Sequence, residues 1–220
     1  MLKNLKYSVI IPTMWMVPDM LLVMLQKYQD NSLIGEILII NNKLGFSLQR
    51  LQEYDKVRVL NGGKNFYVNP SWNLGVSESV CDKIIIANDD IYIENLDGVL
   101  KLVEANIHPG YIFGFGRNCF IQKRGVLPLG KPKISVPKKE LVYGFGVFML
   151  LYKSSYIKIP GPLKVWCGDS LLYNALTPFI IEGIDIRTKM GGTSRQLKLK
   201  QIKKEDKAYY RWLTKIYILD

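Results

Sequence analysis

Two adjacent carboxylates, Asp89 and Asp90, directly follow an apolar run from Ile84 to Ala87. Four consecutive apolar residues are typical of a strand that is covered on both faces. Carboxylates rarely occupy such a place unless a cation lies opposite them. At the carboxyl end of a parallel strand, where α/β proteins bind ligands, the expected cation is a divalent metal that carries a phosphate. The alternative is a turn at the strand end, in which both side chains serve only the backbone.

A third carboxylate, Asp169, follows Trp166-Cys-Gly and stands where a helical pattern begins. A carboxylate under a loop at a helix start can act as a general base if a substrate hydroxyl comes within hydrogen-bond reach. Its other interpretation is a helix cap, and the two roles are compatible.

The first half of the chain alternates strands with helices. Strands are predicted at 7–12, 36–40, 57–60 and 83–88, and helices from Pro18, at 46–54, from a cap at Asn69 to about residue 80, and from a cap at Asn95. This alternation implies right-handed crossovers and a mainly parallel sheet. Every strand ends in polar residues, so we expect one polar rim along one edge of the sheet: Thr13, Asn41-Asn42, Asn61 and Asn88 to Asp90.

The second half has a different pattern. Segments 111–120 and 143–152 are rich in β-formers, with aromatic residues and glycine interleaved, and the Lys/Pro/Gly-rich stretch 122–139 between them predicts a mobile loop. A helix after Asp169 should turn Leu171, Leu172, Ala175 and Leu176 inward. Residues 191–194 predict a flexible turn, and 197–218 a basic amphipathic helix.

Composition limits the class of protein. A length of 220 residues with 48% apolar residues predicts one domain with an ample core. No apolar run is long enough for a membrane span, and the N-terminus lacks the pattern of a signal peptide. The three cysteines have no metal-binding or disulfide spacing, so we predict ordinary thiols in a cytoplasmic protein: Cys81, Cys119 and Cys167.

The net charge of +11 is concentrated near the C-terminus. Ten Lys/Arg and two acids between Arg187 and Lys215 give that stretch +8. A basic segment can contact nucleic acid, an anionic membrane or a phosphorylated substrate, or can be a solvated helix face. No nucleic-acid-binding motif is present, so we expect no nucleic-acid partner. Four aromatic residues beside these charges suit a peripheral membrane contact or a further domain: Tyr209, Tyr210, Trp212 and Tyr217.

Two common nucleotide-binding motifs are missing. The first strand is not followed by G-x-G-x-x-G, and the chain has no G-x-x-x-x-G-K-[ST]. These absences argue against an ordinary dinucleotide-binding fold and against a P-loop enzyme.

Six motifs in order resemble the GT-A glycosyltransferases, in particular the large inverting family 2. They are Val9-Ile-Ile-Pro-Thr13, Asn41-Asn42, the segment from Asn65 to Gly75, the D-x-D-like Asn88-Asp89-Asp90, the strand Tyr143-Gly-Phe-Gly-Val-Phe-Met-Leu, and Trp166-Cys-Gly-Asp169-Ser. Together they cover about residues 7–195, most of the chain. Each is weak alone, and their shared order makes the resemblance fairly specific.

The resemblance implies a three-layer α/β/α fold of the α/β class, with a mainly parallel sheet and a smaller mixed acceptor-side sheet. The expected organisation is a single domain, 1–220, with a nucleotide-binding half (1–106), an acceptor-side half (107–196) and the C-terminal helix (197–220). The implied activity is transfer of a sugar from a nucleoside-diphosphate sugar, most simply a UDP-sugar, to the hydroxyl of a glycan or other acceptor. The implied cofactor is Mn²⁺ or Mg²⁺, and the implied stereochemistry is inversion.

The resemblance also assigns residues. Asp90 is the expected metal ligand and Asp169 the expected catalytic base. The residues expected to contact the nucleotide sugar are Pro12, Thr13, Trp15, Asn41, Lys64, Asn65, Asn73, Asn88, Asp89 and Arg195.

Two positions depart from the family pattern. Asn41 stands where an aspartate is frequent, which puts the nucleotide contacts in doubt. Arg187 to Met190 stand where a metal-binding histidine is frequent, and the single histidine, His108, is far away in sequence. The metal would then be held by Asp90, diphosphate and water.

Two other functions stay open. A sugar nucleotidyltransferase usually has a Gly-rich basic loop after its first strand, and Met14 to Pro18 do not form one. A non-enzymatic membrane- or nucleic-acid-binding domain would use the basic C-terminal segment.

Overall fold

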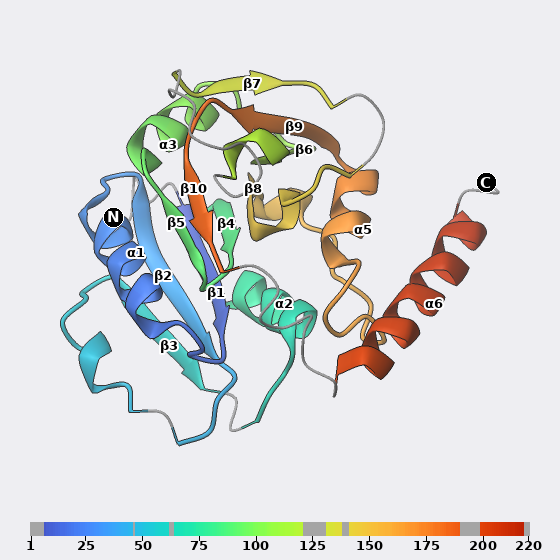
Figure 1. The fold of residues 1–220 in the computed structure, drawn as a ribbon, viewed down its shortest axis with the longest axis horizontal. Coiled ribbons are helices and arrows are strands. Elements are labelled where there is room, and N and C mark those ends of the chain that lie inside the picture. Colours follow the sequence, from blue (N-terminus) through green and yellow to red (C-terminus); the bar gives the residue numbers. More distant parts are fainter. Residues whose placement is uncertain are drawn as a thin grey trace.

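A computed structural model of the chain describes residues 7–45, 47–61, 64–120, 131–137, 141–189 and 199–217. Four strands of the first half run parallel in the order β3-β2-β1-β4 (Figure 1). They are β1 (Tyr7–Thr13), β2 (Ile34–Asn41), β3 (Val57–Asn61) and β4 (Lys83–Ala87). The four predicted strands and their parallel pairing are confirmed, because runs of buried aliphatic residues encode strands that are covered on both faces.

Four strands of the second half extend the same sheet in the order β8-β6-β9-β7. They are β6 (Tyr111–Phe115), β7 (Lys133–Ser135), β8 (Phe148–Tyr152) and β9 (Thr177–Glu182). β8 is antiparallel to β4 and β6, and β7 is antiparallel to β9, whereas β6 and β9 are parallel. A separate two-stranded antiparallel sheet pairs β5 (Ile91–Ile93) with β10 (Ile186–Thr188).

Helices cover both faces of the large sheet. Val9 and Ile11 belong to one core cluster with the apolar sides of α1 (Pro18–Asp30) and α3 (Leu96–Glu104). Ile10, between them in sequence, belongs to a second cluster with residues of α2 (Val68–Glu78) and α5 (Gly168–Ala175). Because successive side chains of a strand point to opposite faces, these two clusters give the predicted three-layer α/β/α arrangement.

The last helix, α6 (Leu199–Tyr217), lies beyond α5 and away from the sheet (Figure 1). It confirms the helix predicted for 197–218 within the described residues. None of the helices in the described ranges has the length and apolarity that crossing a bilayer requires. Four short 3₁₀ turns complete the elements of the described ranges: η1 (Gln49–Leu51), η2 (Arg117–Cys119), η3 (Phe145–Val147) and η4 (Lys153–Ser155).

Several local predictions were wrong. The helix predicted at 46–54 is only the turn η1, and the stretch 122–139 contains strand β7. Asn69 does not cap α2, because the helix starts one residue earlier and the Asn69 side chain bonds elsewhere. Ala175 is exposed, since Leu172 and Tyr173 form the buried face of α5. Residues 191–194 lie outside the described residues. Asn95, by contrast, caps α3 as predicted, through a bond from the Gly98 N–H.

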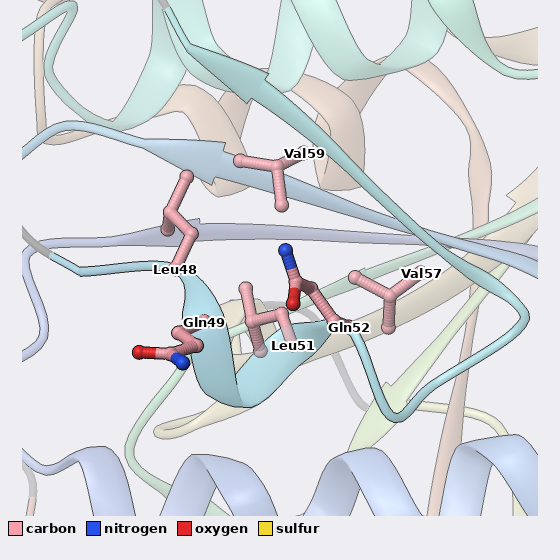
Figure 2. A pocket seen from close by; sticks show the side chains of 6 residues that line it. All are labelled: Leu48, Gln49, Leu51, Gln52, Val57 and Val59. Atoms are coloured by element: carbon pink, nitrogen blue, oxygen red, sulfur yellow. The ribbon is translucent and has the colours of Figure 1, made fainter.

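An open pocket lies between η1 and the edge strand β3 (Figure 2). The side chains of Leu51, Gln52 and Val59 point into it. None of the six residues that line it belongs to the predicted site.

Candidate active site

The strand order places the polar ends of β1 and β4 side by side. β1 lies between β2 and β4: the chain runs from β1 through β2 to β3 on one side and then crosses back to β4 on the other. Such a switch point is where open α/β sheets bind ligands. Thr13 ends β1, and Asp89 follows β4. The Thr13 Oγ1 hydroxyl donates a hydrogen bond to Asp89 Oδ2 at 2.5 Å. Two members of the predicted polar rim are therefore bonded to each other at the centre of the sheet.

The Thr13 hydroxyl also holds the turn after β1. Its Oγ1 accepts the Trp15 backbone N–H at 2.8 Å, and Trp15 adopts a positive φ of 56°. The Trp15 indole N–H then donates to Asn41 Oδ1 at 3.0 Å. This chain of hydrogen bonds links the carboxyl ends of β4, β1 and β2.

Asn41 is oriented by two donors. Its Oδ1 accepts both the Trp15 indole N–H and the Lys43 backbone N–H, the latter at 3.1 Å. The Nδ2 group is consequently the part of the amide left to act as a donor, although Asn41 is itself only 3% exposed. Trp15 is 5% exposed, so its ring offers little surface for stacking on a base. The role that the contacts support for Trp15 is to orient Asn41.

Asp90 lies in a partly buried, negatively charged setting. Burial, and after it the charge of Asp89, raise the pKa of Asp90 to about 6, although the side chains of Thr188 and Asn88 favour its charged form. Burial also raises the pKa of Asp89, against the bond from Thr13. Two adjacent carboxylates with raised pKa values are the setting that a cation would relieve.

The donor set fits a divalent cation. In the described ranges no lysine or arginine forms an ion pair with Asp89 or Asp90. The same ranges contain no group of three His, Cys, Asp or Glu side chains suited to a metal. Mg²⁺ and Mn²⁺ readily take one or two carboxylates and complete their shell with phosphate oxygens and water. His108 precedes β6, at the sheet edge opposite the aspartates.

Sequence reasoning missed Thr188 and the role of Asn42. Thr188 ends β10, which pairs with β5 just after Asp90, and its side chain lies beside the Asp90 carboxylate. Its only signal was its place in the segment where the family frequently has a histidine. Asn42 is buried, and its amide bonds Ser71 Oγ and the Phe66 backbone N–H, both at 3.0 Å. It connects the end of β2 to the start of α2.

The other residues predicted to contact the nucleotide form different hydrogen bonds within the protein. Lys64 and Asn65 are exposed near the start of α2, and Asn65 Oδ1 accepts the Tyr67 N–H at 2.7 Å. The Asn73 amide bonds the backbone of Ile159 through both its nitrogen and its oxygen, and its oxygen also accepts the Tyr156 hydroxyl, so it fastens α2 to the loop after η4. Its contact with a nucleotide stays a prediction, as do those of Pro12 and Asn88. Arg195 lies outside the described residues.

Asp169 reaches the same edge of the sheet from α5. The Asn88 backbone N–H donates to the Val147 carbonyl at 2.9 Å, and Gly146, the neighbour of Val147, packs against the Asp169 carboxylate. Asp169 Oδ1 accepts the Ser170 N–H at 2.8 Å. Asp169 lies inside the first turn of α5 and is not its N-cap, because the residue before the helix is Cys167. Burial raises the pKa of Asp169. A half-buried carboxylate with a raised pKa is suited to accept a proton.

Gly146→Ala is expected to displace this carboxylate. A Cβ at Gly146 would lie 2.5 Å from Asp169 Oδ2 and 2.7 Å from its Cβ, so one of the two segments must move. We expect turnover to fall about tenfold or more, since a displacement near 1 Å can cost about a hundredfold. Donor affinity should stay unchanged. Gly161→Ala is the control, because a Cβ there meets nothing within 4 Å. Equal turnover of both variants would contradict the placement of Asp169.

Comparison with known proteins shows the fold. No protein-family model and no curated protein sequence matches the chain. Its structure is similar to the crystal structure of S. aureus TarS 1–349, with a TM-score of 0.60 and 14% identity over 83% of this chain and 60% of that chain. It is also similar to GalNAc-T7 with UDP, GalNAc and Mn²⁺, with a TM-score of 0.56 and 12% identity over 84% of this chain and 43% of that chain.

A third similar structure is the mannose-1-phosphate geranyltransferase from Thermus thermophilus, with a TM-score of 0.56 and 11% identity over 82% of this chain and 75% of that chain. The chain thus spans 60% of TarS 1–349 and less of GalNAc-T7. These likenesses confirm the predicted GT-A-like glycosyltransferase fold.

Proposed function

We propose that this chain transfers a sugar from a nucleoside-diphosphate sugar, preferably a UDP-sugar, to an acceptor hydroxyl with inversion. The observation that carries the proposal is the pair Asp89–Asp90 at the switch point of the sheet, with Asp169 brought to the same edge through Gly146 and Asn88. TarS has been crystallised with UDP and with UDP-GlcNAc, which supports the choice of UDP as the first donor nucleotide to test.

Asp169 takes the proton in this proposal. The acceptor hydroxyl donates to the Asp169 carboxylate, its oxygen bonds to the anomeric carbon, and the bond from that carbon to the diphosphate oxygen breaks. One displacement of this kind inverts the anomeric configuration. The acceptor, a glycan or another hydroxyl compound, would approach along the residues of η3 and the start of α5, which surround Asp169.

The end of β4 serves the donor. Asp90 would hold Mn²⁺ or Mg²⁺, which when bound offsets the negative charge of the leaving diphosphate. Asp89, which the Thr13 hydroxyl holds, would contact the ribose or the sugar. Asn41, oriented by Trp15, would donate to the nucleoside from its Nδ2 group.

UDP with Mn²⁺ is expected to raise the melting temperature of the protein. Ligand at a hundred times its dissociation constant stabilises a folded protein by about 2.7 kcal/mol, which for a chain of this size is roughly 5–10 °C. Differential scanning fluorimetry with UDP, GDP and dTDP, each with and without metal, measures the shift. Absence of any shift would count against the proposal.

A donor panel tests the reaction itself. Release of the nucleoside diphosphate from each nucleotide sugar, with and without acceptor sugars, identifies the donor. The competing sugar nucleotidyl transfer is tested in the same assay with a sugar 1-phosphate and UTP, where pyrophosphate would be the product.

The outer face of α6 is proposed to contact an anionic membrane surface. Trp212 and Ile216, one turn apart, are 54% and 47% exposed, and three exposed basic side chains lie along one side of them: Lys204, Arg211 and Lys215. Apolar side chains flanked by cations suit the headgroup region of an anionic bilayer. The full chain should sediment with phosphatidylglycerol vesicles, weakly with phosphatidylcholine vesicles, and less after Trp212→Ala. Equal sedimentation with both lipids, or with neither, would overturn the contact and leave a partner domain or a solvated face.

A further inference from the structure

Asp206 is a fully buried carboxylate on a helix whose other charged side chains are exposed or half-buried. It is 0% exposed, whereas its neighbours Glu205 and Lys207 are exposed. A buried carboxylate is unfavourable unless several hydrogen bonds replace its water. The burial of this carboxylate therefore requires specific hydrogen-bond partners, which the basic side chains of α6 do not explain.

Three consecutive backbone N–H groups supply those hydrogen bonds. Asp206 Oδ1 accepts the N–H of Lys164 at 3.0 Å, and Oδ2 accepts the N–H groups of Val165 and Trp166, both at 2.8 Å. Hydrogen bonds to an ionised acceptor are roughly twice as strong as neutral ones. A single side chain of α6 thus fixes the backbone direction of three residues.

The same loop is held from its other side by Asn69 of α2. The Asn69 Nδ2 group donates to the carbonyls of Leu163, at 3.3 Å, and Trp166, at 3.1 Å. The Asn69 backbone N–H donates to the Lys164 carbonyl at 2.9 Å. We call Asn69 and Asp206 the loop clamp. Asn69 binds carbonyl groups of the loop 163–166, and Asp206 binds its N–H groups.

The clamped loop leads directly to Asp169. Cys167 follows with a positive φ of 66°. A Cβ at Gly168 would lie 2.3 Å from Asn69 Oδ1, so the backbone at Gly168 packs directly against the Asn69 side chain. A further contact joins α6 to α5, where the Asn174 Nδ2 group donates to the Tyr210 hydroxyl at 2.7 Å. α6 is thereby attached both to the loop before α5, through Asp206, and to the C-terminal end of α5, through Tyr210.

We propose that Asp206 is a positioning residue for glycosyl transfer, which sets the place of the Asp169 carboxylate by fixing the backbone of residues 164–166. This inference rests on the proposed function, because it gives Asp206 a role in the step that Asp169 performs. It makes α6 a part of the catalytic scaffold, in addition to any contact of its outer face. It also predicts that the effect falls on turnover, since Asp89, Asp90 and Asn41 are on the other half of the sheet.

The test compares Asp206→Asn with two matched variants. Glu205→Gln removes an exposed acid of the same helix, which accepts a hydrogen bond from the Gln201 side chain. Leu213→Ala removes the apolar side chain of α6 that is 8% exposed, and so loosens the helix without touching the loop clamp. Asp206→Glu, which keeps the charge on a longer side chain, is the second variant at the site if Asp206→Asn does not fold.

Three readouts separate positioning from general stability. Amide hydrogen exchange of residues 164–169 should accelerate in Asp206→Asn and stay unchanged in Glu205→Gln. Turnover should fall about tenfold or more in Asp206→Asn at an unchanged affinity for UDP, and the limb of the pH profile that reports Asp169 should move to lower pH as the carboxylate becomes more solvated. Asp206→Glu should restore part of the turnover. Leu213→Ala should lower the melting temperature without moving the pH profile.

Each contrary result has its own meaning. Unchanged exchange at 164–166 in Asp206→Asn overturns the loop clamp whatever the activity. Faster exchange in Asp206→Asn with unchanged turnover overturns the positioning role. A shift of the pH profile in Leu213→Ala as large as that in Asp206→Asn overturns it as well. If the wild-type protein transfers no sugar from any donor, the proposed function fails and the positioning role fails with it, while exchange still decides whether the clamp exists.

Discussion

Asp169→Asn is expected to lower turnover by at least about a hundredfold while the affinity for the donor stays within about twofold, because a general base contributes about 10²–10⁴ to the rate. Asparagine has the size of aspartate and can keep the bond that Asp169 Oδ1 accepts from the Ser170 N–H. The fold and the donor site at β4 should therefore survive, and only the proton acceptor is removed. Single-turnover transfer and calorimetric titration with UDP measure the two quantities separately.

The pH dependence gives the same residue a second test. Burial raises the pKa of Asp169, and the base must be ionised to accept a proton. Turnover of the wild-type protein should therefore rise as the pH increases through this raised pKa, and the rise should be absent in Asp169→Asn.

The control for Asp169 is Asp97→Asn. Asp97 is an exposed acid in the first turn of α3 that pairs with Lys101, so the same chemical change is made away from the site. A loss of less than about tenfold in Asp169→Asn would restrict Asp169 to a structural role at the start of α5.

Asp90→Ala is expected to abolish the dependence of UDP binding on Mn²⁺. A metal at a phosphate contributes several kcal/mol of charge stabilisation, so the affinity for UDP in Mn²⁺ should fall roughly a hundredfold. The affinity without metal should change little. Asp82→Ala is the matched control, since Asp82 is an exposed carboxylate just before β4, at the other end of the same strand. Equal affinities of Asp90→Ala and the wild-type protein in Mn²⁺ would exclude Asp90 as a ligand.

Protons should compete with the metal at this site. The pKa of Asp90 is raised to about 6 by burial and by Asp89. Below that pH the affinity for Mn²⁺ should fall about tenfold per pH unit, since the ligand must be deprotonated. A flat affinity between about pH 5 and 7.5 would contradict the assignment.

Removing Asp90 should also stabilise the metal-free protein. An acid whose pKa is raised on folding destabilises the folded state at any pH above that pKa, because its ionised form is better solvated in the unfolded chain. At about pH 7.5 the melting temperature of metal-free Asp90→Ala should therefore exceed that of the wild-type protein. A substitution that stabilises the protein while it removes activity is expected at a residue that is retained for its function.

Elements with strong local patterns were predictable. The aliphatic runs of β1, β2 and β4, the proline at the start of α1 and the asparagine before α3 all act through their own neighbours in sequence. The η1 and β7 segments were mispredicted because their local preferences are weak. In both, pairing and packing with distant residues decide the conformation.

The candidate site divides in the same way. Asp89 and Asp90 were recognisable because charged residues next to an apolar run are unusual in themselves. Asp169 was singled out by its family-like motif and by its place where a helical pattern begins. The contacts of Thr188, Asn42 and Asp206 were not predictable, although Asn42 belongs to the predicted polar rim and Thr188 to the segment where the family frequently has a histidine. Their partners lie far along the chain, as Asp206 and Trp166 illustrate with a sequence separation of 40.

The sequence by itself determined the type and order of most strands and helices and the place of the paired aspartates at a strand end, because side-chain periodicity and capping act over a few residues. Only the tertiary structure decided that β1 lies beside β4, that Thr13 bonds Asp89, that Trp15 orients Asn41, and that α6 clamps the loop before Asp169. These are contacts between segments whose meeting depends on how the whole sheet and its helices pack, and no local pattern encodes that packing.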